Sequence, residues 1–176
     1  LNHIHLYPII SYNYPAKNKT AAVTTEPNRV LNIRATIRKA LIDASQDKNE
    51  DTLAPRRPTI LLAHSANRWD IEESLQRMQV NGTIYPALGQ IDTLIFYDGY
   101  SVRVGEKVYE YPGVPMDKAY LIEPQKYFRE LVKHDLRIDA GGADLKRLVE
   151  NAIVGRARRG VFASPVNSVQ EITLPA

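Results

Sequence analysis

The sequence has 176 residues, of which 44% are hydrophobic and 24% are charged, the balance of an ordinary globular domain. A chain of this length can bury about 70% of the surface that its unfolded form exposes, so one domain can form without covalent staples. There is no cysteine, which excludes disulfides, zinc fingers and thiol nucleophiles. The net charge of +3 is too small to indicate a nucleic-acid partner by itself.

The sequence contains no apolar run that approaches the roughly 18 residues of a membrane helix. Its N-terminus also lacks the basic and then apolar layout of a signal peptide. We therefore expect a soluble, intracellular chain with no membrane partner. Because the first residue is Leu1 and not methionine, we expect a fragment or a processed form.

The first 46 residues predict an arm followed by a long helix. Tyr7-Pro8 and Tyr14-Pro15 argue against a central strand, so we expect residues 1–24 to form an extended arm or a loose hairpin. From Thr25, which resembles a cap, apolar residues recur at helical spacing to about Gln46. Arg34 and Arg38 fall on the opposite, wetter face of this helix.

The next segment predicts a loop, a buried strand and a second helix. Two prolines mark residues 47–58 as a loop, and the apolar run at 59–63 is typical of a buried strand. Ser65 is expected to cap a helix whose Trp69, Ile71, Leu75 and Met78 face inward. Asn81-Gly82 is expected to end that helix.

Residues 89–111 predict a β region. Asp98-Gly99 separates two β-rich runs, 93–97 and 100–104, and this dipeptide strongly favours a hairpin. Residues 119–123 indicate another buried strand, which ends at Pro124.

The last third predicts one strand around Leu136 and Ile138, a helix at 143–153, and closing strands at 160–163 and 169–174. Strands and helices do not alternate regularly along the chain, so the fold class is α+β with antiparallel hairpins.

The residues that could carry chemistry are few. His3 and His5 supply only two ligands, so we expect no metal site, and no cofactor motif is present. His64, Ser65 and Asp70 are the residue types of a catalytic triad, but helix capping explains Ser65 better. A small hydrolase that uses His64 or His134 is therefore kept only as an alternative to a non-enzymatic role.

Arginine and tyrosine give the other two signals. Arg156, Arg158 and Arg159 form the densest basic cluster, which could contact phosphates in a DNA-binding module or pair with carboxylates at an interface. The ten tyrosines exceed ordinary usage, and four of them crowd the predicted β region. Tyrosine is enriched at protein–protein interfaces, although half-buried strand positions account for some of them.

The order of these elements resembles a known family. A helix at 28–46 is followed by Thr59-Ile60-Leu61-Leu62-Ala63-His64-Ser65-Ala66 and by Ala119-Tyr120-Leu121-Ile122-Glu123-Pro124. The sequence then closes with Arg156-Ala-Arg-Arg-Gly-Val-Phe-Ala-Ser-Pro-Val-Asn-Ser-Val. This succession is similar to the C-terminal two-thirds of the major capsid proteins of tailed bacteriophages. Their Hong Kong ninety-seven type fold is shared with encapsulin shells.

The resemblance implies a division of the chain. Residues 25–58 and 134–176 would form a peripheral domain with the long helix as its spine, and 59–133 an axial domain with hairpins. Residues 1–24 would be an extended arm or a remnant of the family's extended loop.

The resemblance also implies a function. It predicts a structural subunit, not an enzyme, that forms pentamers and hexamers of an icosahedral shell. The shell would enclose double-stranded DNA without reading its sequence, as in a phage or prophage virion, with assembly in the bacterial host cytoplasm. An encapsulin-like compartment with protein cargo is the alternative.

Candidate contacts between subunits follow from this placement. They are Arg34 and Arg38 on the long helix and, in the β region, Tyr97, Tyr100, Arg103, Tyr109 and Tyr111. Arg156, Arg158 and Arg159 are candidates for facing DNA or a neighbouring subunit.

Overall fold

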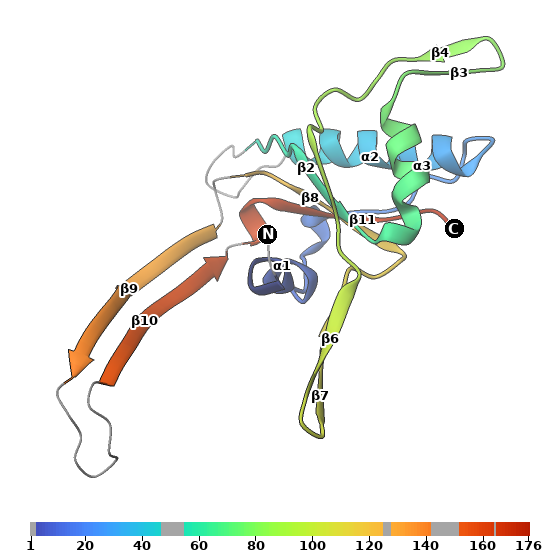
Figure 1. Ribbon diagram of the computed structural model, residues 1–176. Coiled ribbons are helices and arrows are strands. Elements are labelled where there is room, and N and C mark those ends of the chain that lie inside the picture. Colours follow the sequence, from blue (N-terminus) through green and yellow to red (C-terminus); the bar gives the residue numbers. More distant parts are fainter. Residues whose placement is uncertain (1–2, 47–54, 125–127, 142–151, 164) are drawn as a thin grey trace. The chain divides into compact units, whose positions relative to one another are not determined.

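A computed structural model describes residues 3–46, 55–124, 128–141, 152–163 and 165–176 (Figure 1). The chain divides into two compact units. The larger unit comprises Leu1–Tyr127 and Ser164–Ala176, and the smaller unit is Phe128–Ala163.

A five-stranded mixed sheet forms the centre of the larger unit, with strand order β1-β11-β8-β2-β5. In that order the strands are Lys19–Thr20, Val169–Thr173, Lys118–Ile122, Ile60–Ala63 and Thr93–Phe96. The β1–β11 and β2–β5 pairs are parallel, and β8 is antiparallel to both β11 and β2. The predicted strands at 59–63, 119–123 and 169–174 are confirmed, and the chain is a mixture of helix and sheet.

Two helices pack on one face of this sheet. Helix α2 (Arg29–Ser45) buries an apolar stripe that includes Ile33 and Ile37, and α3 (Arg68–Leu75) adds Ile71. These side chains meet every second residue of the central strands, as the alternation of a β-strand requires. The long helix predicted at 28–46 is confirmed, but Asn28 caps it in place of Thr25, with its side chain accepting from the Leu31 amide.

The opposite face of the sheet is covered by the N-terminal segment. Helix α1 (His3–Ile10) and the short helix η1 (Ala16–Asn18) stand where the sequence indicated an extended arm or loose hairpin, so that expectation is wrong for these residues. Burial explains the difference: Leu6 and Ile9 are buried, and the Tyr14 ring lies 5.9 Å from that of Tyr120. Tertiary packing of this kind stabilises a helix of weak intrinsic propensity.

Helix α3 is shorter than predicted and presents a different face. It follows η2 (Ser65–Asn67) and ends at Leu75, so Met78 lies in β3 (Met78–Val80) and not in the helix. Trp69, expected to face inward, is 76% exposed. Ser65 is not the cap, because the His64 side chain accepts from the Ala66 amide.

The Asn81-Gly82 dipeptide is a hairpin turn and not a helix end. It connects β3 to β4 (Thr83–Tyr85), and the two residues have φ of 49° and 81°. Positive φ at both central positions is what a type I′ turn requires, and Asn-Gly is the pair that adopts it most readily. Helix α3 therefore ends at Leu75, before the segment that leads into this hairpin, and not at Asn81-Gly82.

The second hairpin of the larger unit is also displaced from its predicted position. Strands β6 (Gly99–Val104) and β7 (Lys107–Pro112) pair around Gly105-Glu106, so the hairpin predicted around Asp98-Gly99 is wrong. The run at 93–96 instead pairs with β2, because Leu94 and Phe96 pack against the core there. Gly105 has φ of +62°, the conformation that the first central residue of a type II′ turn needs.

The smaller unit is one long antiparallel hairpin. Strand β9 (Phe128–Gly141) pairs with β10 (Ala152–Ala163), with register irregularities between Arg156 and Arg159. The strands predicted around Leu136 and Ile138 and at 160–163 are confirmed as parts of it. Of the helix predicted at 143–153, residues 143–151 lie outside the described residues, and the last two belong to β10.

The five-stranded sheet contains strands from the predicted arm, the predicted axial domain and the predicted peripheral domain. The division of the chain into peripheral and axial domains stays a prediction. Among the helices that the structure describes, none combines the length and apolar character needed to cross a bilayer.

Candidate functional site

The β6–β7 hairpin exposes an apolar face. Directly paired residues of an antiparallel ribbon share a face, so the pairs Tyr100–Tyr111 and Val102–Tyr109 lie together, and Val104 follows them. Tyr100, Val102, Val104 and Tyr109 remain between 40% and 62% exposed. We call the surface of these five residues the aromatic face, and four of the five are therefore exposed to solvent by two-fifths or more.

Two of the predicted tyrosines form the inner end of the aromatic face. The rings of Tyr100 and Tyr111 stack with centroids 4.6 Å apart and an interplanar angle of 22°. Tyr97 stands at the root of the hairpin, where its amide donates to Ala63 and its carbonyl accepts from Val114. Burial, and secondarily Tyr100, raises the pKa of the Tyr97 phenol. The structure therefore brings Tyr97, Tyr100, Tyr109 and Tyr111 together.

The other face of the hairpin is polar and carries Arg103. Its guanidinium donates to the Gly105 carbonyl at 3.2 Å, so it reinforces the turn. Val108 and Glu110 lie on this same face, opposite Arg103 and Ser101. The two faces of the ribbon therefore differ in chemistry, as they do in a strand pair that is covered on one side only.

A close backbone crossing fixes the root of the hairpin. A Cβ atom added to Gly113 would lie 2.1 Å from the Asp98 carbonyl carbon, and one added to Gly99 would lie 2.3 Å from the Tyr111 oxygen. Both obstacles are backbone atoms, which cannot move aside as a side chain can. Only glycine fits at these two positions, and Gly99 also needs its φ of +80°.

Asp98 joins this root to the loop before α3. It accepts from the Ser65 amide at 2.7 Å and from the Ser65 hydroxyl, and its Oδ1 lies 3.5 Å from His64 Nδ1. The Ser65 hydroxyl bond holds the pKa of Asp98 below its usual value; the Ser65 amide and His64 add to this, and partial burial opposes it.

This cluster does not have the order of a catalytic triad. In a triad the serine donates to histidine, whereas here the Ser65 hydroxyl donates to Asp98 and His64 Nδ1 accepts from the Ala66 amide. The third predicted member, Asp70, instead pairs with Arg29. The hydrolase alternative therefore gains no support from His64, and the side chain of His134 lies outside the described residues.

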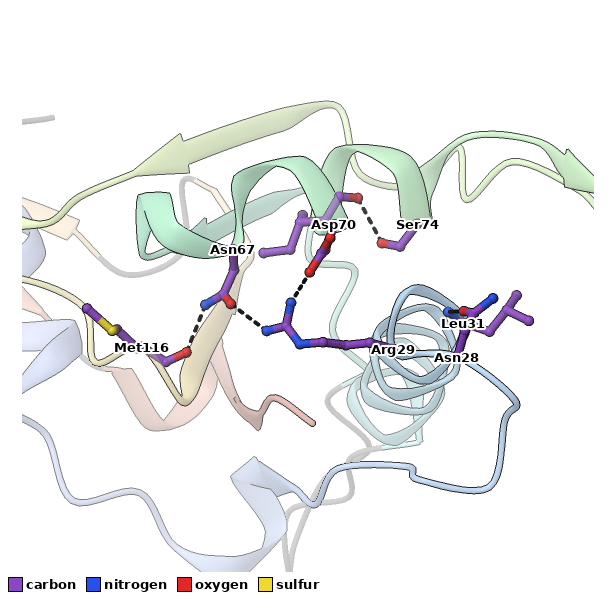
Figure 2. A network of polar contacts seen from close by, with 8 residues as sticks. Asn28, Arg29, Leu31, Asn67, Asp70, Ser74 and Met116 are labelled. Carbon is purple, nitrogen blue, oxygen red and sulfur yellow. Dashed lines mark hydrogen bonds and ion pairs between the residues drawn. The ribbon is translucent and has the colours of Figure 1, made fainter. Parts of the chain in front are cut away.

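A second polar network connects α2 to α3 and to Met116 in the loop after β7 (Figure 2). Arg29 extends from the first turn of α2 to the Asp70 carboxylate, and its other nitrogen donates to Asn67 Oδ1 at 2.7 Å. The amide of Asn67 then donates to the Met116 carbonyl at 2.8 Å. This network fixes the loop at 116 relative to both helices.

Arg34 does not lie on a wet face, contrary to the sequence-based expectation. Its side chain is buried and donates to the carbonyls of Ser74, Gln76 and Pro86, which flank the β3–β4 hairpin. Burial, and secondarily the charge of Arg38, lowers the pKa of Arg34. Arg34 therefore holds the base of a hairpin within its own chain, and a contact with another subunit stays a prediction.

The remaining predicted residues divide into two groups. Arg38 is exposed on α2, as predicted. Arg156, Arg158 and Arg159 lie on β10, in register with β9, and their side chains are outside the described part of the structure. Within the described residues no group of three potential ligands could hold a metal ion.

Three exposed residues of the hairpin were not among the predicted contacts, namely Val102, Val104 and Val108. Their exposure could not be predicted, because β-branched residues in a strand are found on buried and on exposed faces alike. The available signal was the Gly105-Glu106 turn, because a hairpin placed there makes the alternation of residues 100–111 visible.

The comparisons with known proteins find a distant structural neighbour. No protein-family model and no curated protein matches the sequence. Among solved structures, the chain is similar to that of the holo-SrpI encapsulin complex from Synechococcus elongatus PCC 7942, at 11% identity and a TM-score of 0.46. The match covers 97% of this chain and spans 60% of that one.

Proposed function

We propose that this chain is a structural subunit that assembles with copies of itself into an icosahedral shell, as the major capsid protein of a tailed phage or prophage does. The observation that carries the proposal is the aromatic face of the β6–β7 hairpin. It is an ordered, amphipathic ribbon whose apolar side is exposed.

An isolated two-stranded hairpin is marginally stable in water at best. This hairpin is nevertheless anchored by two backbone-crossing glycines and by Asp98, which fixes it in one position. Exposed tyrosine and valine on a fixed element gain free energy when a partner covers them, and aromatic residues are enriched at such interfaces.

A second copy of the chain is the partner that self-assembly requires. Each subunit offers the same ribbon, so the same contact recurs at every subunit of a symmetric assembly. The order of elements described in the sequence analysis supports a shell subunit independently, and the confirmed helix α2 and strands β2, β8 and β11 keep that order. No catalytic role is assigned to any residue.

The contents of the shell are a separate part of the proposal. The family resemblance favours double-stranded DNA, bound without sequence readout, and Arg156, Arg158 and Arg159 are proposed to face it or a neighbouring subunit. The location would then be the virion capsid, with assembly in the host cytoplasm. An encapsulin-like compartment that encloses protein is the alternative within the same architecture.

Gel filtration and negative-stain electron microscopy of the natural-length product test the proposal. We expect closed particles, and a chain that stays monomeric under all assembly conditions would contradict it. Nuclease treatment of intact particles, followed by extraction, separates the two contents. Protected DNA supports the capsid, whereas nuclease-resistant particles that hold only protein support the compartment.

A further inference from the structure

Helix α2 borders a pocket of about 260 Å³ on its outer side. Arg34, Arg38 and Lys39 line it together with Glu26, so three cations face one carboxylate. Ile42 and Tyr85 supply an apolar wall, and Ile42 is 44% exposed. We call this hollow the α2 pocket.

Within the described residues, the positive charge of the α2 pocket exceeds the single negative charge of Glu26. Arg34 is used by the three backbone carbonyls, and its guanidinium lies 5.9 Å from the Tyr85 ring centroid. No ion pair joins Arg38 or Lys39 to any carboxylate of the described chain. The pocket therefore suits a ligand that carries negative charge beside an apolar group.

On the polar face of the β6–β7 hairpin, strand β7 and the turn carry carboxylates beside an apolar side chain, while Arg103 on the same face donates to the Gly105 carbonyl. Val108 and Glu110 alternate on one side of β7, and Glu106 precedes them in the turn. Val108 is 58% exposed, and both glutamates are exposed. Neither carboxylate has an ion pair with another described residue. We call these three residues the acidic edge.

We propose that the α2 pocket of one subunit receives the acidic edge of the β6–β7 hairpin of a second copy of this chain. The glutamates pair with Arg38 and Lys39, and Val108 packs on Ile42 and Tyr85. This inference rests on the proposed self-assembly and names the surface that covers the polar side of the hairpin.

Two features favour a second copy over the phosphates of DNA. The pocket is a compact hollow with an apolar wall, whereas a duplex presents a continuous charged backbone that apolar side chains do not match. The two surfaces are also different parts of the chain, so their contact is head to tail. Repetition of such a contact forms a ring when the rotation between neighbouring subunits closes, which is the case that a shell requires.

The absence of cysteine allows a direct test by disulfide cross-linking. A full-length Val108→Cys chain is mixed with a tagged full-length Ile42→Cys chain, with copper phenanthroline as oxidant. The matched control pairs Val108→Cys with Gln79→Cys, because Gln79 is exposed on β3 outside the pocket. We expect the mixed disulfide of the first pair to form faster than that of the control pair. Equal rates would overturn the inference.

Charge reversal supplies the second arm. Glu106→Lys with Glu110→Lys, placed in the Val108→Cys chain, should slow cross-linking about tenfold, equivalent to about 1.4 kcal/mol of lost pairing. Arg38→Glu with Lys39→Glu, placed in the Ile42→Cys chain, should restore the rate. Reversal of Glu73, an exposed acid of α3, is the control and should leave the rate unchanged. No loss on reversal, or no rescue, would contradict the pairing.

The outcomes separate this inference from the proposed function. Particles that form without the specific cross-link would overturn the α2 pocket contact and leave self-assembly standing. A chain that neither assembles nor cross-links above the control contradicts both. If Arg38→Glu with Lys39→Glu lowers DNA retention and leaves cross-linking unchanged, the pocket faces DNA and the proposed contact is wrong.

Discussion

The backbone crossing at the root of the β6–β7 hairpin makes a quantitative prediction for Gly113→Ala. The new Cβ would lie 2.1 Å from the Asp98 carbonyl carbon and 2.4 Å from the Gly99 nitrogen, far inside the 3.4 Å at which ordinary contact begins. Gly113 does not have a positive φ, so the effect is steric alone. Overpacking of this kind costs about 1–3 kcal/mol.

Substitutions at three other glycines separate steric clash from the backbone strain of a positive φ. Gly105→Ala introduces only the strain of a φ of +62°, with no atom within 4 Å, and should cost about 1 kcal/mol. Gly99→Ala combines clash with strain and should be the most damaging. Gly89→Ala meets neither obstacle and should stay within about 0.5 kcal/mol of the native chain.

Thermal unfolding and amide hydrogen exchange measure this series together. At this chain length each kcal/mol corresponds to about 2–4 °C in Tm. Where the hairpin opens locally, the loss appears as faster exchange in β6 and β7 instead. A Gly113→Ala variant with the Tm and the exchange rates of Gly89→Ala would refute the crossing.

Three further predictions concern the polar contacts. Because the pKa of Asp98 is lowered by folding, the unfolded state binds its proton more readily, and this carboxylate's stabilisation is present above about pH 4 and lost below it. In acid titration followed by circular dichroism, the Asp98→Asn variant should lose less stability below about pH 4 than the native chain. An equal loss of stability in both proteins would count against the Ser65 bonds. Arg34→Met leaves the carbonyls of Ser74, Gln76 and Pro86 without their donor and should destabilise the chain by about 2–3 kcal/mol in urea unfolding, whereas Arg38→Met should be nearly neutral. Asn28→Ala removes the α2 cap and should cost about 1 kcal/mol by the same assay.

The core elements of the larger unit were predictable because their sequences leave little choice. The 3.6-residue period of Ile33 and Ile37 indicates helix α2, and continuous apolar runs indicate β2 and β8. The apolar residues whose spacing indicates each element are also the residues that the element buries in the core. The local pattern and the tertiary packing therefore favour the same structure.

The errors arise where distant partners decide between local alternatives. Asp98-Gly99 has the chemistry of a hairpin turn, but β5 gains more by pairing with β2, which moves the hairpin one strand further. Arg34 is assigned to solvent by its charge, yet three carbonyls from segments 40 or more residues away bury it. Such partners are invisible in a single sequence.

The candidate interface could be predicted from the sequence only in part. The concentration of tyrosine at 97–111 was a usable signal, and the structure places four of these tyrosines in one hairpin and its root. Which face of the ribbon they share depends on the register, and the register depends on the Gly105-Glu106 turn. The exposure of the aromatic face therefore became visible only with the fold.

Sedimentation velocity of the native chain beside a Val102→Ser, Tyr109→Ser double variant tests self-association through the aromatic face most directly. Ile84→Ser, which changes an exposed apolar residue on β4, is the matched control. We expect the native chain and the control to associate, and the double variant to lose about thirtyfold in association constant, the equivalent of about 2 kcal/mol, with an unchanged Tm. Association of the folded double variant at the native strength would contradict the account.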